Sequence, residues 1–225
     1  MIRIKFMLTT AYLGAVIGAG FASGQEIVQF FVNYGASGLK GSIFAAFLFA
    51  ASGSLLMRKA HAIKASSYQN VLADLLSPAT GKIIDLFLAV FLFLGISTML
   101  SASGAIFYEH LYLPKNLGII AAYTALGLCL ARGREGLIAT YNLLVPLKII
   151  LLLAIAAWAV FMPDSGKDVE MPVAFLAEDE DFWLISSTLY VSYNFCLAMV
   201  ILTEYQSIGQ VKEVVIGAWF GGLAL

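Results

Sequence analysis

Charged side chains are scarce in this sequence. Asp, Glu, Lys and Arg make up 12% of the 225 residues, against about 25% in typical soluble domains. Apolar residues make up 61% and fall in long runs, and the mean hydropathy is +0.90. Roughly 20 consecutive apolar residues suffice to cross a bilayer as a helix. The scarcity of charge therefore excludes an ordinary soluble domain and predicts an integral membrane protein.

Cysteine and histidine are also scarce, with two residues of each, and the chain has no excess of positive charge. Cys129 and Cys196 lie in apolar runs, where a small buried side chain is commoner than a disulfide or a metal ligand. His61 and His110 have no partner at metal-ligand spacing, and a net charge of −1 offers no basic surface for nucleic acid. No serine–base pair or acidic cluster falls at membrane depth. We expect no metal, cofactor, nucleic-acid partner or catalytic residue, and no enzyme.

Six complete apolar segments follow one another, and a seventh begins near residue 214. The six cover residues 6–32, 41–57, 83–108, 117–131, 137–162 and 182–203. About twelve residues of the seventh are present, fewer than a span needs, so we expect an N-terminal piece of a longer chain or a coding sequence that was cut short. Residues 67–76 carry leucines and a valine on one helical face and predict a short helix that lies either in the membrane interface or against the bundle.

The distribution of lysine and arginine predicts the orientation of these spans. With the N-terminus in the cytoplasm, nine of the 13 basic residues fall on the cytoplasmic side and three outside, while Lys148 lies within a span. Such a bias favours a cytoplasmic N-terminus. The loop 163–181 is then external and acidic, and both a solvated loop and a mouth that attracts cations remain open.

The first span is poorly suited to one continuous helix. Gly18, Gly20 and Gly24 fall within seven residues, and a glycine in a helix interior costs roughly 0.5–1 kcal/mol relative to alanine. We predict two half-helices, residues 6–17 and 24–32, joined by unwound backbone. One straight helix, with its glycines forming a close-packing face, is the alternative.

A polar sequence follows these glycines. Ser23-Gly24-Gln25-Glu26 matches the Ser-x-x-Glu capping box, which marks the start of a helix. A carboxylate near the bilayer centre costs about 2.5–3.5 kcal/mol on insertion scales. Glu26 either serves only as a cap or also binds a cation or a proton.

Lys148 stands deep within the fifth span. It lies roughly 16 Å from the start of the span at 1.5 Å per residue. A buried ammonium group needs a carboxylate or a carbonyl partner, or it must lose its proton. Two interpretations stay open: a static pair that holds two helices together, and a lysine that titrates or replaces an ion.

Small polar residues gather in the middle of the third and sixth spans. Ser97, Ser101 and Gly104 share one face of the third span, which suits either tight helix packing or the lining of a polar path. The sixth span carries Ser192-Tyr193-Asn194 at mid-depth, and an amide is costly to bury without a partner.

The order of these features resembles the LeuT-type inverted-repeat transporters of the amino acid–polyamine–cation superfamily. Within it, the runs 18–26 and 192–194 are most similar to the bacterial YkvI-type membrane proteins. The resemblance implies an all-α membrane helix bundle in the bacterial cytoplasmic membrane. Residues 1–162 would form a first five-helix repeat with a broken first helix, 163–181 an external loop, and 182–225 the start of a second, inverted repeat.

The resemblance also implies secondary active transport of a small polar solute, an amino acid or an amine, by alternating access coupled to H⁺ or Na⁺. The implied solute-binding residues are Gly18, Ala19, Gly20, Phe21, Ala22, Ser23, Gly24, Gln25, Ser97, Thr98, Ser101, Ser192, Tyr193 and Asn194. Glu26 and Lys148 are the expected coupling residues, the latter because some proton-coupled relatives carry a lysine where sodium binds in others. A transporter-like receptor that binds a solute without moving it is the alternative. The expected partners are the solute, the lipid bilayer and, in a homo-oligomer, further copies of the chain.

Overall fold

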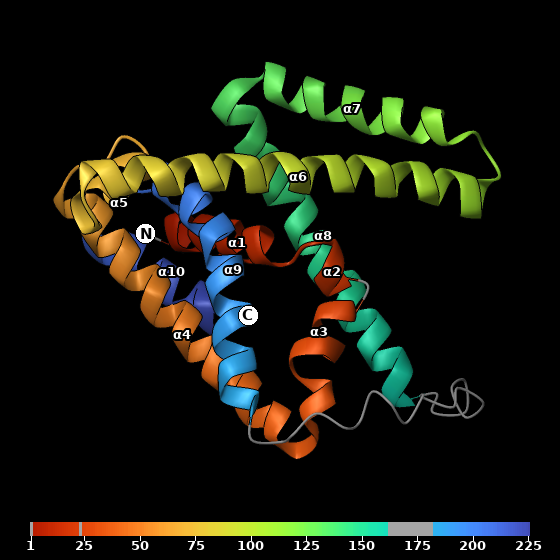
Figure 1. The fold of residues 1–225 in the computed structure, drawn as a ribbon, viewed down its shortest axis with the longest axis horizontal. Coiled ribbons are helices and arrows are strands. Elements are labelled where there is room, and N and C mark those ends of the chain that lie inside the picture. Colours follow the sequence, from red (N-terminus) through yellow and green to blue (C-terminus); the bar gives the residue numbers. More distant parts are fainter. Residues whose placement is uncertain (1, 23, 162–181) are drawn as a thin grey trace. The chain divides into compact units, whose positions relative to one another are not determined.

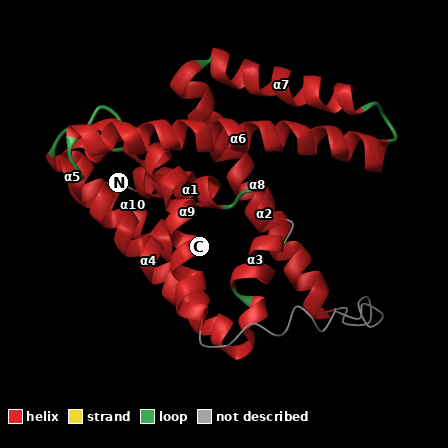
Figure 2. Cartoon of the chain, in the orientation of Figure 1, coloured by secondary structure: helices red, strands yellow, loops and turns green. Residues whose placement is uncertain are grey.

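The computed structural model describes residues 2–22, 24–161 and 182–225. Figure 2 shows that helices joined by short loops make up these ranges, and no strand occurs in them. The all-α expectation is therefore confirmed, whereas the predicted external loop 163–181 lies outside the described residues. The chain divides into a main unit, Met1–Tyr68 with Asn142–Leu225, and an α6–α7 unit, Gln69–Tyr141.

The predicted apolar segments correspond to helices. In the part of the chain that the structure describes, the helices and the 3₁₀ turn η1 are α1 (Ile2–Val16), α2 (Ala19–Ala22), α3 (Gln25–Phe30), η1 (Val32–Tyr34), α4 (Gly35–Ala62), α5 (Tyr68–Leu75), α6 (Pro78–Leu111), α7 (Lys115–Ala131), α8 (Gly133–Phe161), α9 (Trp183–Glu204) and α10 (Val211–Leu223). Within the described ranges, three helical stretches are long and apolar enough to cross a membrane: Gln25–Ala62, Pro78–Leu111 and Trp183–Glu204. The helix predicted at 67–76 is present as α5.

The core of the main unit lies where α1, α4, α9 and α10 pack together (Figure 1). Glycines on α10 allow this close approach. A β-carbon at Gly222 would overlap the backbone of Ala50 on α4, and one at Gly221 would come within 3.1 Å of Tyr12 on α1. Small residues at helix contacts let backbones approach, which is how helices associate in lipid.

Two side-chain hydrogen bonds anchor α1 to its neighbours. The buried hydroxyl of Tyr12 donates to the carbonyl of Phe49 on α4 at 2.7 Å, and Thr9 Oγ1 donates to Gly217 on α10 at 3.1 Å. Polar groups buried in an apolar core must be paired in this way to avoid a desolvation penalty. The bonds fix the half-helix that precedes the predicted break.

The α6–α7 unit is a helical hairpin. Ser77 caps the start of α6 by accepting from the amide of Thr80 at 3.2 Å, and a proline follows at the first helical position. Gly104 on α6 lies against Ile119 and the carbonyl of Lys115, and Gly118 on α7 lies against Phe107. Close packing therefore accounts for Gly104, one of the small residues of the third span.

Candidate functional site

The first apolar segment is interrupted directly after α1. The amide of Ile17 donates to the carbonyl of Leu13 at 2.8 Å, but the amide of Gly18 donates to Val16, only two residues earlier, at 2.8 Å. Regular bonding to residue i−4 therefore ends at Ile17. The expected interruption is present, and the alternative of one straight helix is wrong.

The backbone beyond this interruption corrects the prediction in detail. Residues 19–22 are not unwound but form the single helical turn α2. The N-cap of α3 is Gly24 rather than Ser23, which lies outside the described residues, and Gly24 has a left-handed backbone with φ 77°. Glycine adopts a positive φ without steric cost, so the chain turns at Gly24. The second half-helix thus begins at Gln25 and ends at Phe30, shorter than predicted.

Lys148 on α8 reaches the point where α1 ends. Its Nζ donates to the carbonyl oxygen of Ile17 at 2.8 Å. The last carbonyls of a helix have no helical partner and carry partial negative charge, so a cation is favourable there. The expectation of a carboxylate or carbonyl partner for Lys148 is confirmed, and the partner is a carbonyl at the interruption itself.

Glu26, in the first turn of α3, folds back toward α2. A β-carbon on Gly20 would overlap Glu26 Oε1, so the carboxyl group lies directly against the Gly20 backbone. Oε2 of the same group is buried and has no hydrogen-bond partner in the part of the chain that the structure describes. The side chains of Tyr190 and Tyr193 on α9 are close enough to interact with this carboxyl group. A buried oxygen of this kind is rare in folded proteins and needs an explanation.

Aromatic rings surround Tyr190, which is 4% exposed. Its ring centroid lies 5.4 Å from that of Phe30, 5.1 Å from that of Phe31, 5.9 Å from that of Phe49 and 5.8 Å from that of Tyr193. These spacings are those of favourable aromatic pairs. We call Phe30, Tyr190 and Tyr193 the aromatic cluster.

A hydrogen bond joins α9 to the end of α3. Ser186 on α9 is buried, and its Oγ donates to the carbonyl of Phe30, the last residue of α3, at 3.0 Å. This bond pairs one of the carbonyls that a helix leaves open at its C-terminal end. The first half of α9 therefore forms a wall against the second half-helix.

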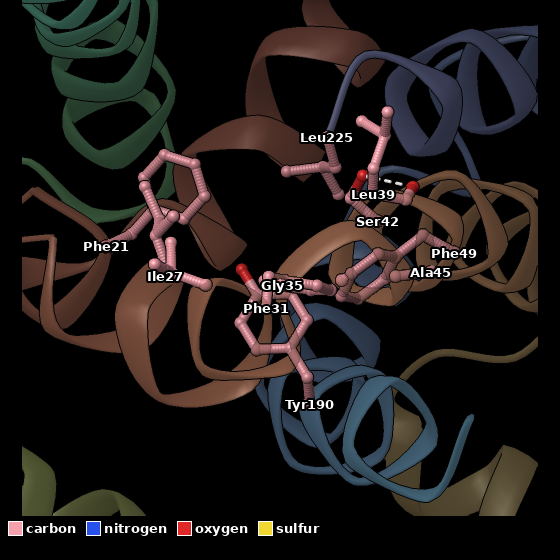
Figure 3. A pocket seen from close by; sticks show the side chains of 12 residues that line it. Phe21, Ile27, Phe31, Gly35, Leu39, Ser42, Ala45, Phe49, Tyr190 and Leu225 are labelled. Atoms are coloured by element: carbon pink, nitrogen blue, oxygen red, sulfur yellow. Dashed lines mark hydrogen bonds between the residues drawn. The ribbon is translucent and has the colours of Figure 1, made fainter. Parts of the chain in front are cut away.

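A cavity of about 340 Å³ opens beside this wall (Figure 3). Phe21 and Ile27 contribute from α2 and α3, Phe49 contributes from α4 and Tyr190 from α9. No charged side chain is found among the described residues that line it. Its volume falls within the range of small-molecule sites, which are mostly apolar with a few placed polar groups.

The predicted solute-binding residues of the broken segment take different positions. Phe21 lines the cavity, Gly20 contacts Glu26, and Gln25 is exposed. Gly18 and Gly24 belong to the two interruptions, and Ala19 and Ala22 supply backbone to α2.

On α9 the structure separates the predicted trio. Tyr193 faces Glu26, and Asn194 is 2% exposed with its Nδ2 donating to the carbonyl of Tyr190 at 3.2 Å. Ser192 is exposed and donates to Thr188 of its own helix at 2.7 Å. The helix α9, which corresponds to the sixth predicted span, thus meets the broken segment through Tyr193 rather than Ser192.

The predicted residues of the third span belong to the α6–α7 unit. Ser97, Thr98 and Ser101 are exposed on α6. The first two donate to carbonyls of their own helix, at 2.8 and 2.9 Å. Their role beside the interruption stays a prediction.

Sequence reasoning missed Tyr190, the centre of the aromatic contacts. The signal was present, because Tyr190, Tyr193 and Asn194 stand at positions i, i+3 and i+4 and so share one helical face. Phe30 also escaped notice, since nothing local to α3 indicates which helix it meets.

No family model and no solved structure matches the chain. It is 31% identical over 220 residues to "Uncharacterized membrane protein YkvI" of Bacillus subtilis (strain 168), a match that covers 97% of the chain and 62% of the relative. It is also 34% identical over 116 residues, 52% of the chain, to "Uncharacterized protein YyaD" of the same organism, covering 32% of that protein. The chain thus spans less than two thirds of each relative. The chain is thus similar over nearly its whole length to a protein named as a membrane protein, and its described residues include three helices long and apolar enough to cross a membrane.

Proposed function

We propose that the protein is a secondary active transporter of a small polar solute, an amino acid or an amine, coupled to H⁺ or Na⁺. The observation that carries the proposal is the interruption after α1, on which Lys148 from α8 converges at 2.8 Å. Irregular backbone at membrane depth is tolerated only where protein buries it or a cavity adjoins it. Many secondary transporters build their solute and ion sites from such half-helix ends.

In this proposal the Ile17 carbonyl and the Lys148 ammonium group form the coupling element. The ammonium group occupies the position at the end of α1 that a cation would favour. Loss of a proton from the ammonium group would weaken its bond to the carbonyl, and a bound Na⁺ would displace the ammonium group from it. Either event would release α8 from the interruption. One state then has α8 tied to α1 and the other does not, as alternating access requires.

The remaining features support a solute site next to this element. The cavity adjoins α2 and α3 on one side and α9 on the other. Glu26 lies on the same short helix α3, and Tyr190, which interacts with its carboxyl group, lines the cavity. We place the protein in the bacterial cytoplasmic membrane with its N-terminus inside, as the charge bias favours. A LeuT-type inverted repeat is the architecture that this proposal assumes.

Uptake by proteoliposomes tests the proposal. The protein is produced from its natural gene, and a mixture of labelled amino acids and amines is supplied under imposed proton and sodium gradients. We expect accumulation that an uncoupler or a sodium ionophore abolishes. Uptake that persists when both gradients are collapsed would refute the coupling, and binding without flux would indicate a receptor instead.

Lys148→Met tests the coupling element, with Lys40→Met as its matched control. Lys40 is an exposed lysine in the first part of α4. We expect Lys148→Met to lose gradient-driven accumulation while Lys40→Met keeps it. Wild-type accumulation in Lys148→Met would remove this residue from the mechanism.

A further inference from the structure

The buried oxygen of Glu26 needs a cationic or hydrogen-bond-donating ligand. Oε1 is packed against Gly20, but Oε2 has no hydrogen-bond partner within the described ranges. Leaving a buried acceptor unpaired costs free energy. Lys148, which reaches this segment from α8, is bonded to the Ile17 carbonyl. A ligand from outside the chain can supply the missing donor.

The aromatic cluster narrows the chemistry of that ligand. Tyr190 and Tyr193 both interact with the Glu26 carboxyl group, and Phe30 packs on both rings, at 5.4 and 5.7 Å between centroids. Aromatic faces attract organic cations, most strongly where water is excluded. A carboxylate beside aromatic rings therefore favours an ammonium group over an uncharged donor.

The neighbouring cavity argues against a carboxylate on the same ligand. Tyr190, which interacts with Glu26, lines the cavity together with Ile27 and Phe31. The described lining residues include no lysine, arginine or histidine to pair with an acid. A second carboxylate would also lie near Glu26 and be repelled by it. The apolar lining instead matches a hydrocarbon body.

We propose that the solute is a small primary amine without a carboxylate, whose ammonium group binds Glu26 and whose apolar body occupies the cavity between α3, α4 and α9. This inference rests on the proposed function, because it assigns the solute to the site at the interruption. It separates two classes that the proposed function leaves together, amines and amino acids.

Three compounds that share a phenylethyl group test the inference. Phenethylamine carries only the amine, phenylalanine carries both groups, and 3-phenylpropionate carries only the acid. Binding of labelled phenethylamine to the purified protein is measured at equilibrium, and each compound is used as competitor. We expect phenethylamine to compete at least tenfold more effectively than phenylalanine, and 3-phenylpropionate not to compete.

Variants locate the binding. Glu26→Gln keeps the shape of the side chain and should weaken phenethylamine binding at least tenfold. Glu109→Gln, the same substitution at an exposed site on α6, should leave it within twofold. Tyr190→Phe keeps the ring and should retain binding, whereas Tyr190→Leu should weaken it severalfold. Gel filtration and thermal unfolding show which variants fold, and the competition series on the unaltered protein needs no variant.

The outcomes separate this inference from the proposed function. Equal competition by phenylalanine, full binding by folded Glu26→Gln, or no binding of phenethylamine would each overturn the amine site. If phenethylamine does not bind but another solute is taken up along an ion gradient, the transporter proposal stays intact. Phenethylamine binding that depends on Glu26, without flux of any solute, would support the amine site and refute transport.

Discussion

Replacing Gly20 with alanine should dislodge the Glu26 carboxyl group without unfolding the protein. The new β-carbon would overlap Oε1 and lie 2.9 Å from Cγ and Cδ of Glu26. These atoms belong to the end of a flexible side chain, which can move to another rotamer. An off-rotamer side chain costs about 0.5–1.5 kcal/mol, and alanine in place of a helical glycine returns about 0.5–1 kcal/mol. The net change in stability should therefore stay within about 1 kcal/mol.

The effect on binding should be larger. If Glu26 forms a charge-assisted hydrogen bond to the solute, moving it away removes about 1.5–3 kcal/mol, which corresponds to a loss of affinity of roughly 10- to 150-fold. Gly18 provides the matched control, because a β-carbon there would meet only the Val16 oxygen, at 4.0 Å. Gly18→Ala should bind phenethylamine nearly as well as the unaltered protein.

Equilibrium binding and thermal unfolding of both variants in detergent give the two quantities side by side. Unchanged binding in Gly20→Ala would show that the position of the Glu26 carboxyl group does not matter to the solute. Equal losses in Gly18→Ala and Gly20→Ala would show that the segment responds to any added methyl group. Either result refutes the reasoning.

Three further substitutions test the structure by thermal unfolding. Gly222→Ala should destabilise the main unit by about 1–3 kcal/mol, because the new β-carbon would overlap the α4 backbone. Its control, Gly127→Ala, should be neutral or stabilising, because nothing lies within 4 Å of a β-carbon there. Equal effects of the two substitutions would contradict the close helix contact. Gly24→Ala should lower the stability by about 1–2 kcal/mol, because φ of Gly24 is 77°. Gly24→Asn should lower it less. Equal losses in the two variants would argue against the left-handed turn. Tyr12→Phe removes the buried bond to Phe49 and should cost about 0.5–1.5 kcal/mol, so an unchanged midpoint would question that contact.

The helices and the interruption were within reach of the sequence. Apolar runs of spanning length identify α4, α6 and α9, because the length of a helix in lipid is set by the bilayer. The glycines near residue 20 predict a break because each weakens a helix locally. The capping-box motif misplaced the start of α3. It predicted Ser23 as the N-cap, but the left-handed backbone at Gly24 makes Gly24 the N-cap, and the helix begins at Gln25.

The partners across the site were beyond reach for a different reason. Lys148 predicts a carbonyl or carboxylate partner from its own chemistry, but its partner Ile17 stands 131 positions away. The same holds for Ser186 and Phe30, which are 156 positions apart. Such pairs are decided by how whole helices pack, and no local pattern encodes them. The contact of Gly222 with Ala50 belongs to the same class.

The bond from Ser186 to Phe30 has a mechanical consequence. It fastens the short α3 to the long α9, and the ring contacts of Tyr190 with Phe30 and Phe31 reinforce the attachment. A six-residue helix has little rigidity of its own, so α3 should move together with α9. A spectroscopic label on the exposed face of α9 would therefore report the displacement of α3 as well.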